Sequence, residues 1–158
     1  MAVTVIGLEK STSKDLAKDL NVLLANLQLY YQNLRGVHWN VKGEQFFQLH
    51  AKFEELYLDA QEKVDEVAER ILTLGGIPLH TFEDYIKESE IKAGKNISEG
   101  KATVQLILDS IQVLLKIERD ILDKSGELND EGTNAMMSDF ISFQEKTAWM
   151  LKAFLGEK

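Results

Sequence analysis

The sequence predicts an all-α fold in which four long helices pack as one bundle. Apolar residues recur at steps of three and four through four long segments, which is the period of amphipathic helices. The chain has one proline and ten glycines, and most glycines fall between these segments, as expected of long helices with few joints. No segment alternates apolar and polar residues as a strand does. At 158 residues, we expect a single domain that spans residues 1–158.

The first two helices form half of this bundle. Thr12 or Ser13 can cap the first helix, which we expect to run to about residue 40. Its apolar stripe comprises Leu16, Leu20, Leu23, Leu27, Tyr30, Leu34 and Val37. The second helix is expected to start at about Glu44 and to end at Gly75-Gly76. Its stripe comprises Phe46, Leu49, Phe53, Leu56, Ala60, Val64, Val67, Ile71 and Leu74.

A long connection of weak periodicity follows, from His80 to Gly100. Thr81, with Asp84 three residues later, can cap a short helix that runs through Lys87. A long connection in the middle of a four-helix bundle makes its second and third helices parallel, which is the crossover of ferritin-like bundles. We therefore predict a ferritin-like four-helix bundle with a short extra helix in the crossover.

The last two helices complete the bundle. Ser98 can cap the third helix, which closes near Gly126. Its stripe comprises Val104, Ile107, Ile111, Leu114, Ile117 and Ile121. The fourth helix starts at Asn129 or Asp130. The residues expected to face the core from this helix are Met136, Phe140, Phe143, Met150 and Phe154.

Charge and cysteine content narrow the class of protein. A formal net charge of -8 disfavours a generally basic nucleic-acid binder and favours a protein that attracts cations. Because the chain has no cysteine, it has no disulfide framework and no thiolate metal site, which fits a reducing cytoplasm. We expect neither a signal peptide nor a membrane span, and therefore a cytoplasmic protein.

Two histidines and three carboxylates form a candidate set of metal ligands: His38, His50, Glu54, Asp65 and Glu69. Imidazole with carboxylate suits iron, zinc or manganese. A hairpin that turns near residues 41–43 places His38 beside His50, and a rotation of about 100° per residue puts the carboxylates on the side of the second helix that carries His50. However, a rise of about 1.5 Å per residue separates His50 from Asp65 by roughly 22 Å. One chain therefore holds two half-sites.

A second copy of the chain can complete both half-sites. If the second helix packs antiparallel against its copy about an axis near Asp59 or Ala60, His50 comes beside the partner's Glu69. The pattern alone also permits the ordinary interpretation, in which these carboxylates are solvated charges on a helix surface. No histidine follows a glutamate by three positions, so a di-iron centre within the core of one bundle is not expected.

Several motifs resemble one known family over essentially the whole chain. They are His38-Trp39-Asn40-Val41-Lys42-Gly43, Phe46-Phe47, Leu49-His50, Phe53-Glu54-Glu55-Leu56-Tyr57 and Asp65-Glu66-Val67-Ala68-Glu69-Arg70-Ile71. The short helix in the crossover and the ending Trp149-Met150-Leu151-Lys152-Ala153-Phe154-Leu155 fit as well. This sequence is similar to Dps proteins, the ferritin-like DNA-binding proteins from starved cells.

The resemblance implies a function and a set of site residues. It implies a hollow dodecamer that oxidises Fe(II), preferably with hydrogen peroxide, and stores the ferric product as mineral. The catalytic iron ligands would be His38 and His50 from one subunit and Asp65 and Glu69 from the subunit across the two-fold interface. Glu54 would be an additional acidic ligand or hydrogen-bond partner nearby, Trp39 would lie beside the centre, and zinc is a possible substitute for iron.

Acidic residues near the start of the fourth helix have two interpretations. The resemblance places Asp130 and Glu131 near the three-fold pores through which iron would enter, where a negative cleft concentrates cations. Acidic residues in a first turn also simply complement the helix dipole. The family's pore pattern is only partly matched, because Ala135 occupies a position that is acidic in some relatives.

DNA binding is expected to be weak or absent. Family members that bind DNA tightly carry a mobile lysine-rich tail, whereas this chain offers Lys10, Lys14 and Lys18 at helical spacing. On an acidic particle such a stripe is more often a solvated face, and phosphate binding by few cations is weak and salt-sensitive. Two alternatives stay open: a DNA-compacting nucleoid protein with secondary iron chemistry, and a purely structural protein, which has no need for the four ligands together.

Overall fold

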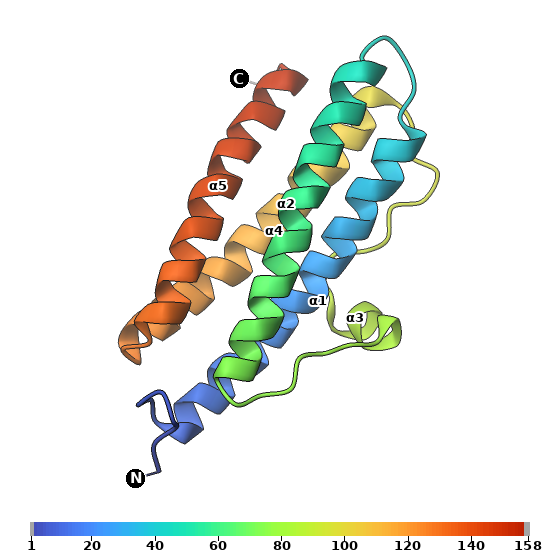
Figure 1. The fold of residues 1–158 in the computed structure, drawn as a ribbon. Coiled ribbons are helices and arrows are strands. Elements are labelled where there is room, and N and C mark those ends of the chain that lie inside the picture. Colours follow the sequence, from blue (N-terminus) through green and yellow to red (C-terminus); the bar gives the residue numbers. More distant parts are fainter. Residues whose placement is uncertain (1, 157–158) are drawn as a thin grey trace.

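The structure, a computed structural model, describes residues 2–156 and contains five helices in that range (Figure 1). They are α1 (Lys10–Asn40), α2 (Phe46–Thr73), α3 (Phe82–Glu88), α4 (Gly100–Glu127) and α5 (Glu131–Leu155). Pairing of β type is limited in this range to the isolated bridges of Val3 with Glu9 and of Lys42 with Glu99. The predicted all-α fold with one short extra helix is confirmed. No helix within residues 2–156 combines the length and the apolar character needed to cross a bilayer.

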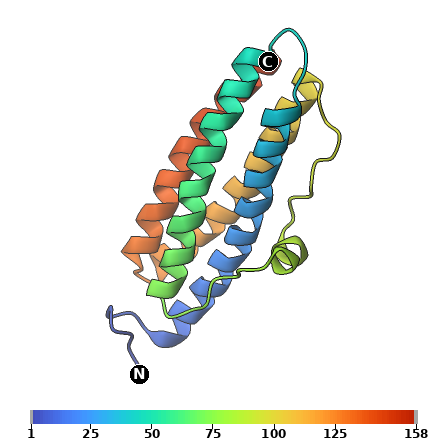
Figure 2. The same ribbon diagram turned by 45° about the vertical axis from the view of Figure 1, so that its right-hand side comes forward.

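The four long helices are arranged as two antiparallel pairs, α1 with α2 and α4 with α5 (Figure 1). The crossover between α2 and α4 runs the length of the bundle, so these two helices point in the same direction, as predicted (Figure 2). Along the way, the crossover places α3 against the outer side of α1 (Figures 1 and 2). The face of α2 that points away from α1 is thereby left free of the crossover.

The core is built mainly from the predicted stripes of α1, α2 and α4, and α5 adds Met137, Phe140, Ile141 and Leu151. Every stripe residue of α1 is buried, and Phe53 and Leu56 of α2 meet Ile107, Ile111 and Leu114 of α4 in the same cluster. Full burial of one such side chain contributes about 1.5–3 kcal/mol relative to exposure. Helices of this length are therefore held mainly by packing of one apolar face.

Two asparagines of α1 hold the crossover, a role that the apolar pattern did not indicate. The Oδ1 atom of Asn26 accepts hydrogen bonds from the hydroxyl of Ser89 and from the backbone N–H groups of Glu90 and Ile91. Asn33 accepts from the N–H of Gly94 at 2.8 Å and donates to a backbone carbonyl of the crossover. These side chains satisfy backbone groups that have no helix to bond within.

Some predicted helix starts were wrong by one to four residues. α1 begins after Glu9 rather than after Thr12 or Ser13, because the N-terminal segment folds back and the N–H of Lys10 donates to the carbonyl of Ala2. α2 begins at Phe46, close to the expected start.

Two caps lie in the crossover and were predicted with different success. At α4 the cap is Glu99 instead of Ser98, and its carboxylate accepts from the N–H groups of Lys101 and Ala102, which lowers the pKa of Glu99. The predicted cap of α3 is confirmed, since Thr81 accepts from the N–H of Asp84.

The buried face of α5 differs from the predicted one. Of the five residues expected to face the core, only Phe140 is buried, and Phe143 is exposed. The face that does pack inward comprises Thr133, Met137, Phe140, Ile141, Gln144, Thr147 and Leu151. Three of these residues are polar, and Met136 and Phe154 pack against the core only partly buried, so the apolar period located the inward face of this helix in part. α5 begins after Asp130, one of its two predicted starts.

Candidate metal centre

His38 and His50 lie face to face where α1 turns into α2. Their ring centroids are 3.9 Å apart and the planes differ by 11°. The Nδ1 atom of His38 lies 2.6 Å from the carbonyl oxygen of His50, and the Nδ1 atom of His50 lies 2.8 Å from the carbonyl oxygen of His38. The predicted hairpin between the first two helices made these two residues neighbours, and this relationship is confirmed.

The two hydrogen bonds determine the tautomer of each neutral ring. A carbonyl oxygen only accepts, so each Nδ1 atom must carry the hydrogen and donate it. The lone pair of each neutral ring is then on Nε2, which is the state in which imidazole binds a metal ion. Donation from the other ring nitrogen to a backbone carbonyl is also the usual support of a metal-ligating histidine.

Aromatic rings enclose the histidine pair, and one carboxylate approaches it. Phe46 stacks on His50 with a centroid distance of 4.9 Å, and the edge of Tyr57 meets His38 at 5.3 Å. His38 is only 5% exposed, whereas Glu54 is exposed on the outer face of α2. The Oε1 atom of Glu54 lies 3.8 Å from Nε2 of His38, so this carboxylate can join a ligand sphere built on that nitrogen.

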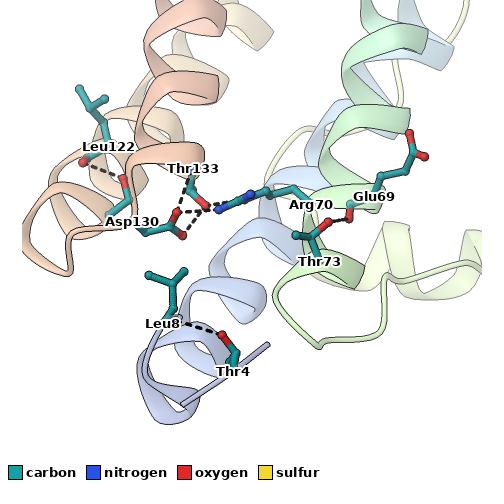
Figure 3. A network of polar contacts seen from close by, with 9 residues as sticks. Thr4, Leu8, Glu69, Arg70, Thr73, Leu122, Asp130 and Thr133 are labelled. Atoms are coloured by element: carbon teal, nitrogen blue, oxygen red, sulfur yellow. Dashed lines mark hydrogen bonds and ion pairs between the residues drawn. The ribbon is translucent and has the colours of Figure 1, made fainter. Parts of the chain in front are cut away.

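Asp65 and Glu69 lie further along α2, one helical turn apart on its exposed side. The negative charge of Asp65 raises the pKa of Glu69, a repulsion that a bound cation would relieve. Glu69 points outward from the bundle, on the other side of α2 from Arg70 (Figure 3). A shallow hollow of about 650 Å³ lies beside Asp65 and is lined by Leu58, Gln61, Glu62, Val64 and Asp65.

The two half-sites do not meet within one protomer. Nowhere in residues 2–156 do three histidine, aspartate or glutamate side chains come close enough together to hold a metal ion. The histidine pair with Glu54 and the Asp65–Glu69 pair thus each remain incomplete, as the spacing along α2 requires.

Comparison with known proteins assigns the chain to a family. A ferritin-like domain model matches residues 17–158. The "DNA protection during starvation protein" of Porphyromonas gingivalis is 44% identical over 150 residues, which cover 95% of this chain and 94% of that protein. The chain belongs to the ferritin-like Dps family.

Solved structures of Dps proteins agree with this assignment. The Dps protein of Vibrio cholerae, described as a member of the ferritin-like diiron-carboxylate superfamily, has a TM-score of 0.96 with 52% identity, over 98% of each chain. Dps from Bacillus brevis has a TM-score of 0.89 with 35% identity, over 94% of this chain and 99% of that one. Membership of the Dps family supports iron storage and protection as the general role, with ferroxidase-type chemistry.

Trp39, the aromatic residue expected beside the centre of this Dps chain, follows His38 on α1 and is exposed. The guanidinium of Arg35 lies 4.8 Å from the centre of the Trp39 ring and 5.5 Å from that of Tyr31. Arg35 was not predicted from the sequence, although its spacing of four residues from both Tyr31 and Trp39 was a usable signal.

The two acidic residues that were predicted to line a pore differ in solvent exposure. Asp130 is 2% exposed in the protomer, and its carboxylate is bound by Arg70 and Thr133, so it is not free to bind a cation there and its pore role stays a prediction (Figure 3). Glu131 is exposed and remains a candidate. The burial of Asp130 could not be read from the sequence because Arg70, its partner, is 60 positions away.

The lysines proposed for DNA contact lie at the start of α1. Lys10, Lys14 and Lys18 are exposed and line one wall of a groove of about 720 Å³. Leu72 and the residues up to Ile77 form the opposite wall.

Proposed function

We propose that this protein oxidises Fe(II) with hydrogen peroxide at centres shared between two subunits. His38 and His50 of one subunit, with Glu54 nearby, would bind iron together with the partner's Asp65 and the partner's Glu69. The reciprocal hydrogen bonds of the histidine pair are the observation that carries this proposal, because they orient two free Nε2 atoms at a place where one chain supplies no further nitrogen ligand.

The exposed apolar residues of α2 support the same two-fold arrangement. An axis between Asp59 and Ala60 lies midway between His50 and Glu69 in the chain, and also midway between Phe47 and Leu72. Phe47 is 81% exposed and Leu72 is 59% exposed in the protomer. The axis that completes the metal centre would therefore also bury each Phe47 against the partner's Leu72. A symmetric interface requires this kind of reciprocal pairing.

The ligand set suits the proposed reaction. In this reaction two Fe(II) ions each give one electron to a hydrogen peroxide molecule, its O–O bond breaks, and two protons complete two water molecules. A few protein ligands leave positions on iron open to peroxide, and carboxylates favour Fe(III) over Fe(II). Because each hydrogen peroxide molecule would accept two electrons at one centre, the reaction would remove peroxide without releasing radicals.

Assembly and storage belong to the same proposal. We infer a dodecameric cage in the cytoplasm, built through two-fold contacts of α2, in which the ferric product is kept as mineral. Exposed Glu131 at the start of α5 would help to draw Fe(II) inward. Zinc would compete for the centre, since it accepts the same imidazole and carboxylate ligands.

Complementation between two inactive variants tests the shared centre directly. In a His50→Gln variant and in a Glu69→Gln variant every centre lacks one ligand, so both should oxidise iron slowly. In a mixed dimer one centre lacks both ligands and the other is intact. With random pairing at equal amounts, co-assembly should restore about a quarter of the wild-type rate.

Controls for this experiment use the same variants. The two proteins mixed after assembly, without subunit exchange, should remain inactive. Particle mass shows whether co-assembly has occurred, and Fe(II) followed by peroxide under anaerobic conditions gives the rate by absorbance. A co-assembled particle with no recovered activity would refute a centre shared across the two-fold axis, as would full activity in either variant alone.

DNA compaction remains a second candidate because the three lysines of α1 are exposed on one groove wall. Few cations on an acidic particle predict binding that is lost at physiological salt. A mobility shift that persists at this salt concentration, and disappears when Lys10, Lys14 and Lys18 are replaced by glutamine, would establish this role.

A further inference from the structure

The last turns of α2 are joined to the start of α5 by the side chain of Arg70 (Figure 3). One terminal nitrogen of the guanidinium donates to Oδ1 of Asp130 at 2.6 Å, and Nε donates to the hydroxyl of Thr133 at 3.0 Å. That hydroxyl in turn donates to Oδ2 of Asp130 at 2.6 Å. We call these three residues the Arg70 clamp.

The start of α5 is shaped to receive the guanidinium. Asp130 caps α5 by accepting from the N–H of Thr133, so its carboxylate is held in place before Arg70 binds it. Gly132 leaves the space that the guanidinium fills, since a Cβ atom there would lie 2.7–2.9 Å from three guanidinium atoms. A planar fork held by an aspartate and a threonine also fixes direction, which a single point charge does not.

The clamp bears on the metal centre because Arg70 follows Glu69 directly on α2. The two side chains leave the helix on different sides, Arg70 toward α5 and Glu69 outward (Figure 3). α2 packs mainly against α1, so the clamp is a direct tie between this part of α2 and the α4–α5 pair. At a radius of about 6 Å, a rotation of α2 by about 10° would move the Glu69 carboxylate by about 1 Å.

A displacement of this size matters for a metal ligand. Metal–ligand distances in proteins stay within about 0.2 Å of their usual values, and a misplacement of about 1 Å can lower a rate roughly a hundredfold. We propose that Arg70 is a positioning residue, whose clamp to Asp130 and Thr133 sets the direction in which Glu69 meets the partner's His50. This inference rests on the proposed function, because it assumes the shared centre.

Binding of Co²⁺ alone, without peroxide, tests the clamp. Titration calorimetry and the visible absorption of bound Co²⁺ are measured on assembled particles of wild type and of the Arg70→Gln variant. We expect Co²⁺ affinity to fall about tenfold or more and the absorption band to change, as for other groups that orient metal ligands. The matched control is Arg119→Gln, which removes an exposed ion pair with Glu145 and should keep wild-type Co²⁺ affinity.

A second variant keeps Arg70 and changes only the space beside Gly132 that its guanidinium occupies. Gly132→Ala should displace the guanidinium and, like Arg70→Gln, lower the Co²⁺ affinity. If Arg70→Gln does not assemble, the Co²⁺ affinity of Gly132→Ala is the test of the clamp. Particles that unfold more easily but bind Co²⁺ with wild-type affinity would show a merely structural role and overturn the inference.

A His50→Gln variant separates this outcome from failure of the proposed function. If His50→Gln loses Co²⁺ while both clamp variants bind it normally, only the clamp inference fails. If His50→Gln binds Co²⁺ like wild type, the shared centre fails and the clamp inference with it.

Discussion

His38 and His50 each donate their Nδ1 hydrogen to the backbone carbonyl of the other, over 2.6 and 2.8 Å. Each residue is thus both a candidate ligand and the support that orients the other. Replacement of one side chain leaves the carbonyl acceptor in place but removes the ring that stacks on the other at 3.9 Å, and both rings would serve one centre, so the effects of two replacements should not add. The pair behaves as one chemical unit contributed by the joint between α1 and α2.

Loss of one histidine should therefore remove most of the activity. We expect His50→Gln to slow peroxide-driven iron oxidation about 10- to 100-fold, and His38→Gly with His50→Gly to add little to this loss. The rate is measured by absorbance after peroxide is added to protein loaded anaerobically with Fe(II). His80→Gln, at the exposed third histidine, is the control and should keep the wild-type rate. A wild-type rate in the doubly substituted protein would contradict the proposed centre.

The apolar contacts proposed across the axis give a prediction about assembly. Phe47→Lys should introduce a charge opposite the partner's Leu72 and dissociate the particle, with loss of iron oxidation although every proposed ligand remains. Adding Leu72→Glu to this variant should place a negative charge opposite each new lysine across the axis and recover much of the assembly. Light scattering and circular dichroism separate dissociation from unfolding. Unchanged particle mass in Phe47→Lys alone would place the axis elsewhere.

The fold was predictable where burial follows one apolar period. The stripes of α1, α2 and α4 are regular, so both their helices and the parallel crossover could be derived from spacing. α5 was harder to orient because its inward face includes Gln144 and Thr147, which a hydrophobic period does not count. The start of α1 depends on a contact between Lys10 and Ala2, and such tertiary contacts shift helix ends away from the best local cap.

The candidate site was predictable to the level of which residues share a face. Helical geometry alone predicted that His50 and Glu69 belong to different half-sites. It could not predict the tautomer of the histidines, which depends on carbonyl groups brought close by the hairpin. Nor could it predict that Asp130 is enclosed by Arg70, since only the packing of α2 near α5 joins them.

Neighbouring carboxylates at the start of α5 should respond differently to replacement. Asp130→Asn leaves the largely buried guanidinium of Arg70 without a charge partner and should destabilise the protein by about 3–5 kcal/mol. Glu131→Gln alters an exposed residue, so stability should change by less than about 0.5 kcal/mol while iron uptake slows. Urea unfolding and the rate of mineral growth are measured for both. Equal effects of the two changes on stability would contradict this division of roles.

The core also contains an acid that the proposed chemistry does not use. Glu118 of α4 is 0% exposed, and no group within residues 2–156 forms a hydrogen bond with either carboxyl oxygen. Burial raises the pKa of Glu118 to about 8, although the positive charges of Lys63 and Arg119 act in the opposite direction. The folded protein therefore keeps a neutral acid in its core at pH 7.

The sign of the resulting pH dependence follows from the raised pKa. Stability from this group is fully present below the unfolded pKa of about 4.5 and is lost as pH rises from there through the folded pKa of about 8, on the order of 5 kcal/mol in all. Glu118→Gln retains the shape and cannot ionise, so its stability relative to wild type should rise from about pH 5 to about pH 8 and level off above that. Urea midpoints at fixed protein concentration measure this difference, and Glu145→Gln, an exposed change, should give curves parallel to wild type. Parallel curves for Glu118→Gln would instead mean that Glu118 is already ionised in the folded core.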